Sequence, residues 1–137
     1  MVITYEGVFA ESPEVKLTAQ KKPTSFAGPS LVTETTNESI ADTTQYIGTK
    51  FRIWGHLLEA IDPYPGLPGK TVKIMRKINN GAYAVFDTLV TDSTGHILKT
   101  YTLADVGVNT FKLVFDGDAL YSGCSKEAKT LAQMRPR

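Results

Sequence analysis

Hydrophobic and polar residues alternate along the second half of the chain, most clearly between residues 50 and 58. One side of this segment carries Phe51, Ile53 and Leu57, and the other side carries Arg52, Trp54 and His56. A period of two predicts a half-buried β-strand, because successive side chains of a strand point to opposite faces of its sheet.

Five more strands follow from the same reasoning, over residues 71–78, 82–91, 96–103, 110–115 and 121–132. Turn residues separate them: a proline- and glycine-rich loop at 62–69, Asn79-Asn80-Gly81, and acidic glycine turns at 92–95 and 116–118. Asn80-Gly81 predicts a type I′ hairpin turn. With no helical period, these elements indicate an all-β sandwich or barrel.

The first third of the chain is less regular. Residues 2–10 and 14–20 are predicted strands, whereas residues 23–46 are rich in Thr, Ser, Glu and Gly and predict a long exposed connection. Within it, residues 30–36 are the best candidate for pairing at a sheet edge. We therefore divide the chain into an extension or tail of a preceding repeat (1–12), a sandwich with a long polar insertion near 25–47 (13–133), and a tail (134–137).

Composition narrows the class of protein. The chain has 137 residues, 42% hydrophobic content and a net charge of +1, which fits one domain and favours neither nucleic acid nor an anionic membrane as partner. We expect no membrane insertion, because no apolar run approaches the ~20 residues of a span. The N-terminus has no signal-peptide pattern. Cys124 is the only cysteine, so an intrachain disulfide is impossible.

Four motifs occur in order between residues 48 and 121. They are a Gly-bounded segment at 48–55, a Leu-Pro-Gly turn and strand at 67–74, a Thr-Asp-x-x-Gly turn at 91–95, and Phe115-Asp-Gly-Asp-Ala-Leu-Tyr121. This pattern resembles the bacterial and archaeal immunoglobulin-like (Big-type) repeat domains of large surface proteins. The resemblance covers residues 48–132 and implies an immunoglobulin-like β-sandwich of about seven antiparallel strands. Its expected partners are neighbouring repeats or other surface proteins, in an extracellular or cell-surface location.

A short internal similarity is consistent with a tandem array. Residues 3–20 and 113–133 both read as a strand, an acidic glycine turn and a strand ending in Ala-Gln. If the similarity reflects a true repeat, the chain begins with the tail of a preceding unit.

Four residues are predicted to have structural roles. Gly69, Gly95 and Gly117 occupy turns that need a residue without a Cβ. Tyr121 is placed to cover the edge of the core while its hydroxyl bonds a nearby backbone group, in the manner of a tyrosine corner.

Two groups of residues are candidates for chemistry. Trp54, Tyr64 and Tyr83 form either core and edge packing or an aromatic platform for a polysaccharide. Asp116 and Asp118 either form turns through their own backbone or supply oxygens to a calcium ion, the one cofactor considered. The two histidines, His56 and His96, are expected at turns or on the surface.

No nucleophile or acid–base constellation can be assembled from these residues, so we expect no enzyme. The expected function is a structural or adhesive module, serving as a spacer or stalk of a larger surface protein. The alternatives are a carbohydrate-binding accessory module and a structural or decorating protein of a virus particle.

Overall fold

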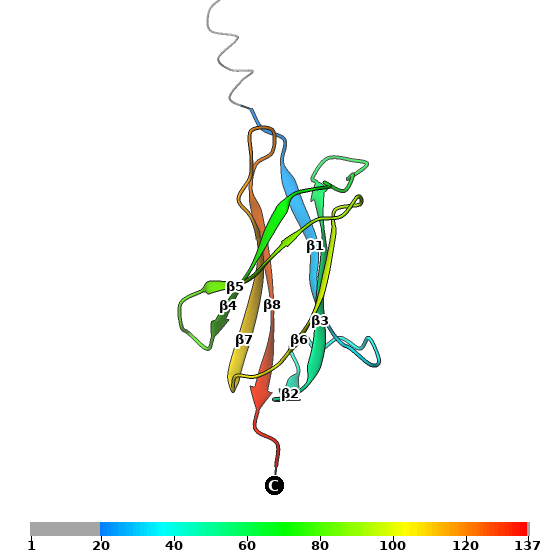
Figure 1. Ribbon diagram of the computed structural model, residues 1–137. Coiled ribbons are helices and arrows are strands. Elements are labelled where there is room, and N and C mark those ends of the chain that lie inside the picture. Colours follow the sequence, from blue (N-terminus) through cyan, green and yellow to red (C-terminus); the bar gives the residue numbers. More distant parts are fainter. Residues whose placement is uncertain (1–19, 137) are drawn as a thin grey trace, which may run out of the picture.

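Two β-sheets packed face to face make up the part of the chain that the computed structural model describes, residues 20–136 (Figure 1). The smaller sheet has the order β1 (Thr24–Thr33), β3 (Lys50–Glu59) and β6 (His96–Thr102). The larger sheet has the order β2 (Thr44–Tyr46), β8 (Cys124–Gln133), β7 (Gly107–Phe115), β4 (Thr71–Ile78) and β5 (Ala84–Val90). Neighbouring strands are antiparallel except for β2 and β8, which are parallel. The predicted all-β sandwich is confirmed at this level.

The core lies between the two sheets and is built from the inward side of each alternating strand. Phe51 of β3 and Phe111 of β7 meet at its centre, with ring centroids 5.4 Å apart. Ile53 and Leu113 are fully buried beside them. Removing each such side chain from water stabilises the fold by about 1.5–3 kcal/mol, which explains why the period of two fixes which face points inward.

The two long sides of the sandwich differ. On one side, β1 and β2 lie next to β8 and close the gap between the sheets. On the other side, β5 and β6 are both edge strands, and Asp87 of β5 bridges them. Its carboxylate accepts hydrogen bonds from Lys99 Nζ and Tyr101 Oη of β6, both at 2.8 Å. The Lys99 ammonium lowers the pKa of Asp87, and burial raises the pKa of Tyr101.

The expectation of a long exposed connection is wrong for residues 24–33 and 44–46, which are strands, whereas the pairing at a sheet edge expected for residues 30–36 occurs over residues 30–33. Residues 24–33 form the ten-residue strand β1, in which Phe26 and Leu31 belong to the core. Gly28 and Pro29 interrupt the alternation, because the register with β3 shifts between Ala27 and Ser30. An edge strand tolerates such a bulge and a proline, since its outer side needs no ladder hydrogen bonds. The described residues therefore contain eight strands, whereas about seven were expected.

The predicted strand at 71–78 is confirmed, and the later strands agree with the prediction within a few residues. The type I′ turn at Asn80-Gly81 is wrong. Among residues 79–81 only Asn79 has a positive φ, which is 53°. Five residues connect β4 to β5, so the connection is longer than a two-residue hairpin turn. Two strands were expected at residues 2–10 and 14–20, and the first half of the internal repeat at residues 3–20. Except for Gln20, these residues lie outside the part of the chain that the structure describes.

The described chain enters and leaves the sandwich at opposite ends (Figure 1). Lys22 lies beside Tyr121 at the end where β7 turns into β8, and the chain leaves beyond β8 at the other end. Among residues 20–136, no helix has the length and apolar character that a membrane span requires.

Candidate functional site

The outward face of the three-stranded sheet carries most of the chemically interesting side chains. The alternation of β3 buries Phe51, Ile53 and Leu57, so Arg52, Trp54 and His56 point away from the core as predicted. The register places their cross-strand partners on β6: Arg52 opposite Thr100, Trp54 opposite Leu98, and His56 opposite His96. Two strands separated by about 40 residues thus build one surface.

Three aromatic rings gather at one end of this face. The ring centroids of His56 and His96 lie 4.6 Å apart with a 37° angle between the ring planes. Trp54 lies 5.9 Å from His96 and meets His56 edge-on at 6.3 Å. The indole is half-buried on the outer face, so it contributes to neither the inner core nor a fully exposed platform.

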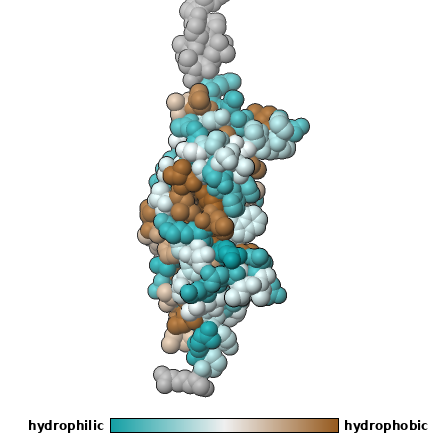
Figure 2. Space-filling model, turned by 45° about the vertical axis from the view of Figure 1, so that its right-hand side comes forward, coloured by the Kyte–Doolittle hydropathy of each residue, from teal (hydrophilic) through white to brown (hydrophobic). Residues whose placement is uncertain are grey.

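An open groove of about 400 Å³ runs beside these rings, and its wall is largely apolar. It is lined by Val32, Asn37, Arg52, Trp54, His96 and Leu98. Arg52 Nη1 donates a hydrogen bond to Asn37 Oδ1 at 2.7 Å, which holds both polar groups at the rim. Figure 2 shows exposed hydrophobic side chains gathered at mid-height of the sandwich, among hydrophilic ones.

The 92–95 turn fixes the start of β6 and therefore the position of His96. Asp92 Oδ1 accepts hydrogen bonds from the backbone N–H groups of Thr94 at 2.8 Å and His96 at 3.0 Å. These bonds lower the pKa of the Asp92 carboxyl, the Thr94 N–H contributing most. Asp92 Oδ2 lies 3.8 Å from His96 Nδ1. Gly95 has φ +80°, and a Cβ added there would lie 2.4 Å from the carbonyl oxygen of Leu57, which is too close for an ordinary contact.

Tyr83 lies outside the groove, on the outer face of the five-stranded sheet. Its hydroxyl donates a hydrogen bond to Glu127 Oε1 at 2.7 Å, and Lys77 and Lys112 lie over its ring at 4.9 and 4.2 Å from the centroid. Burial and then the Glu127 carboxylate raise the pKa of Tyr83 to about 12. Tyr83 therefore does not share a platform with Trp54.

Tyr64, the third predicted aromatic, lies in the connection between β3 and β4. Its side chain is exposed and its φ is +57°. Because it is not among the residues that line the groove, the structure leaves Trp54 as the only one of the three predicted aromatics there.

Asp116 and Asp118, the predicted calcium ligands, each pair with a lysine. Lys73 Nζ lies 2.8 Å from Asp116, and Lys70 Nζ lies 2.6 Å from Asp118. Asp118 Oδ1 also accepts two backbone N–H groups of the following turn, including that of Tyr121. The Lys70 hydrogen bond is the largest cause that lowers the pKa of Asp118 to about 2. In the described part of the chain, no three His, Cys, Asp or Glu side chains group around a common metal position.

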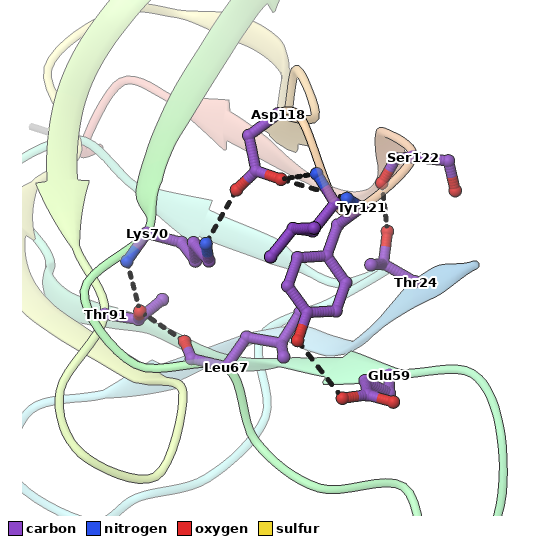
Figure 3. Close-up of polar contacts among 9 residues, drawn as sticks. Thr24, Glu59, Leu67, Lys70, Thr91, Asp118, Tyr121 and Ser122 are labelled. Carbon is purple, nitrogen blue, oxygen red and sulfur yellow. Dashed lines mark hydrogen bonds and ion pairs between the residues drawn. The ribbon is translucent and has the colours of Figure 1, made fainter. Parts of the chain in front are cut away.

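Tyr121 covers this end of the core, but its hydrogen bond differs from the expected one (Figure 3). The hydroxyl donates to Glu59 Oε2 at 3.3 Å, not to a backbone carbonyl, and Lys70 Nζ lies 5.0 Å from the ring centroid. Beside it, Thr24 Oγ1 donates to the carbonyl of Ser122 at 2.7 Å. Tyr121 therefore joins both sheets, and among the described residues it lacks the backbone bond that defines a tyrosine corner.

The two remaining predicted glycines have positive φ values. Gly117 has φ +88°, and a Cβ there would lie 2.9 Å from the backbone nitrogen of Gly123. Gly69 has φ +69° with no atom within 4 Å of an added Cβ. Gly117 is therefore required by close packing as well as by conformation, whereas Gly69 is required by conformation alone.

Sequence reasoning missed the contact between His56 and His96. The alternation along each strand places both histidines on the outward side, and each histidine follows a glycine. Neither feature of the sequence predicts the register between β3 and β6. In comparisons with protein-family models, with curated proteins and with solved structures, no match was found. Interpretation of the face therefore rests on its geometry.

Proposed function

We propose that this chain is a non-catalytic, immunoglobulin-like module that serves as a spacer or stalk unit of a longer surface protein. The strand order supports the immunoglobulin-like class: β1-β3-β6 corresponds to strands A-B-E, and β8-β7-β4 corresponds to G-F-C. β5 extends the second sheet, as the additional strands of variable-type domains do. Its partners would be neighbouring modules or other surface proteins.

One observation carries the spacer function: the path of the chain from one end to the other. The N-terminal segment runs parallel to the β8 region, and the two leave the sandwich at opposite ends (Figure 1). When the ends are pulled apart, these parallel segments slide along each other. Their hydrogen bonds then lie across the direction of separation and share the load, whereas peeling would break them one by one.

Two patches of hydrogen bonds connect these segments. At the entry end, Lys22 N–H donates to the carbonyl of Leu120 and Ser122 N–H donates back to Lys22, both at 2.9 Å. At the exit end, Leu131 N–H donates to the carbonyl of Thr43 at 2.9 Å, and Ile47 N–H donates to Gln133 at the same distance. The module therefore has a hydrogen-bonded patch near each point where force enters.

The test is single-molecule unfolding with force applied through the two ends. Leu131→Pro removes the N–H that bonds Thr43, and its ring also fixes the backbone φ within the strand. Leu131→Ala keeps that N–H and removes a partly exposed side chain, so it is the matched control. We expect Leu131→Pro to lower the unfolding force well below that of Leu131→Ala. Equal forces for the two variants, or a wild type that extends without a force peak, would contradict the spacer function.

A second function is favoured by the groove beside Trp54. An indole flanked by Arg52 and Asn37 offers a saccharide an apolar surface for its ring and polar groups for its hydroxyls. In this carbohydrate-binding alternative, titration with a panel of soluble polysaccharides shifts the emission of Trp54 to shorter wavelength, and Trp54→Ala abolishes binding. Tyr83→Ala is the control, because Tyr83 lies on the other sheet. Emission that none of the polysaccharides changes would leave the spacer function alone.

A further inference from the structure

We propose that His56 and His96 form a binding site for a divalent transition-metal ion that prefers imidazole, such as Cu²⁺, Ni²⁺ or Zn²⁺. The two imidazoles supply two ligands from neighbouring strands, and water or an external ligand completes the coordination. The inference stands on its own and does not depend on the spacer function. It concerns a site on the outer face of the sheet, away from Asp116 and Asp118.

The backbone register places the two histidines at a favourable pair of positions. His56 and His96 are direct partners and the last pair of this ladder, and continuing the same register sets Leu57 opposite Gly95. Leu57 N–H donates to the carbonyl of Gly95 at 2.8 Å, so that pair is the hydrogen-bonded one. Because antiparallel pairs alternate, His56 and His96 form a non-hydrogen-bonded pair, in which Cα atoms are about 4.5 Å apart and side chains are closest.

The rings themselves already lie in contact. Their centroids are 4.6 Å apart, and both side chains leave the sheet on the same face. Rotation about side-chain bonds is therefore enough to direct one nitrogen of each ring at a common ion, with no movement of β3 or β6. The His96 side chain is 27% exposed, which gives an ion and its water ligands access.

A carboxylate beside His96 favours a cation. Asp92 Oδ2 lies 3.8 Å from His96 Nδ1, and Asp92 is itself held by the backbone N–H groups of its turn. A small rotation of the imidazole would bring Nδ1 within hydrogen-bonding distance of this carboxylate and leave Nε2 for the metal, as second-sphere carboxylates do in metalloproteins. Gly95 fixes the same turn, so the β6 ligand is attached to a rigid backbone.

The chain contains its own reporter for this site. Trp54 is the only tryptophan, and its ring centroid lies 5.9 Å from that of His96 and 6.3 Å from that of His56. Bound Cu²⁺ quenches a tryptophan at such a separation. We therefore expect saturable, one-to-one quenching of Trp54 by Cu²⁺, reversed by EDTA. Zn²⁺ should compete with Cu²⁺ and raise the melting temperature, because an ion that binds only the folded state stabilises it.

Substitutions separate this site from other metal-binding groups. His56→Phe and His96→Phe keep an aromatic ring in place and remove the ligating nitrogens, and each should weaken Cu²⁺ binding at least about tenfold. Asp92→Asn should weaken it by a smaller factor. Cys124→Ala is the matched control and should leave the titration unchanged, because Cys124 lies at the start of β8 in the other sheet.

The proposal is overturned if Cu²⁺ gives no saturable quenching, or if quenching with the same midpoint persists in the variant that carries both His56→Phe and His96→Phe. Far-ultraviolet circular dichroism shows whether that variant remains folded. If the double variant is unfolded, the test is the rise in melting temperature that Zn²⁺ causes in each single variant. A rise equal to that of the wild type in both His56→Phe and His96→Phe would reject the site.

Discussion

The outer faces of the two sheets follow the same alternation and yet carry different chemistry. On the five-stranded sheet, the outer face carries Lys77, Lys112 and Lys129, and the first two lie over the ring of Tyr83, whose hydroxyl donates a hydrogen bond to Glu127. On the three-stranded sheet, Trp54 and two histidines lie in contact beside an apolar groove. On the five-stranded sheet, the aromatic side chain of Tyr83 contacts charged groups of the same chain. On the three-stranded sheet, Trp54 and His96 line an open groove that a ligand could enter.

The inner faces of the two sheets form the core, so this contrast indicates which outer face is the better candidate for binding a ligand. Cation–π contacts and an exposed hydrogen bond each contribute about 1 kcal/mol or less, so the lysine-rich face is explained by modest stabilisation and solubility. The histidine pair contributes no ion pair between its members and no burial in the core. Both proposals for a ligand concern that face.

The largest effect is expected where the histidine face depends on its supporting turn. Gly95→Ala places a Cβ 2.4 Å from the carbonyl of Leu57 and 2.7 Å from the nitrogen of Leu67, at a φ that alanine adopts only with strain. Because these neighbours are backbone atoms, the turn must shift. We expect a loss of about 3 kcal/mol or more in the free energy of unfolding, measured by urea denaturation, together with weaker metal binding.

Gly69→Ala is the matched control, since Gly69 also has a positive φ but no atom lies within 4 Å of an added Cβ. It should lose only about 1 kcal/mol, the cost of the left-handed conformation itself. Equal losses for the two variants would show that conformation, not the close approach of Leu57 and Leu67, governs Gly95. In that case close packing of the turn would no longer explain why glycine precedes His96.

The sequence predicted which side chains face inward because that property is local. Phe51, Ile53 and Leu113 alternate with polar neighbours, and a slip of one residue would move all of them into water. β1 was not predicted for an equally local reason. Gly28 and Pro29 lie at its bulge and interrupt the alternation of hydrophobic and polar residues there. β2 is a three-residue, polar, parallel strand that has no sequence signal of its own.

The candidate site was predictable only in its parts. The outward position of Trp54 and His56 followed from the parity of β3, and both histidines were expected at turns or on the surface. Their contact with each other depends on the register between β3 and β6, which no local pattern encodes. The lysine partners of Asp116 and Asp118 were missed for the same reason, since they come from the segment before β4 and from β4 itself.

The smallest effect is expected on the lysine-rich face and concerns its titration. The pKa of Tyr83 is raised from its ordinary value of 10.0 to about 12, chiefly by burial and then by Glu127. A raised pKa in the folded state means that the folded protein holds this proton more tightly than the unfolded chain does. The resulting stability is fully present below pH 10 and is lost as the pH rises from about 10 to about 12.

Tyr83→Phe removes this proton and the exposed hydrogen bond to Glu127, and should cost about 0.5 kcal/mol at neutral pH. Its free energy of unfolding should therefore fall less steeply than that of the wild type between pH 10 and 12, in parallel urea titrations. In the ultraviolet titration of phenolate, the variant should lack a transition with a midpoint of about 12. If the lost transition instead has its midpoint near 10, the charges on this face do not hold Tyr83 as the structure indicates, and the contrast between the two faces reduces to the histidine pair and its groove.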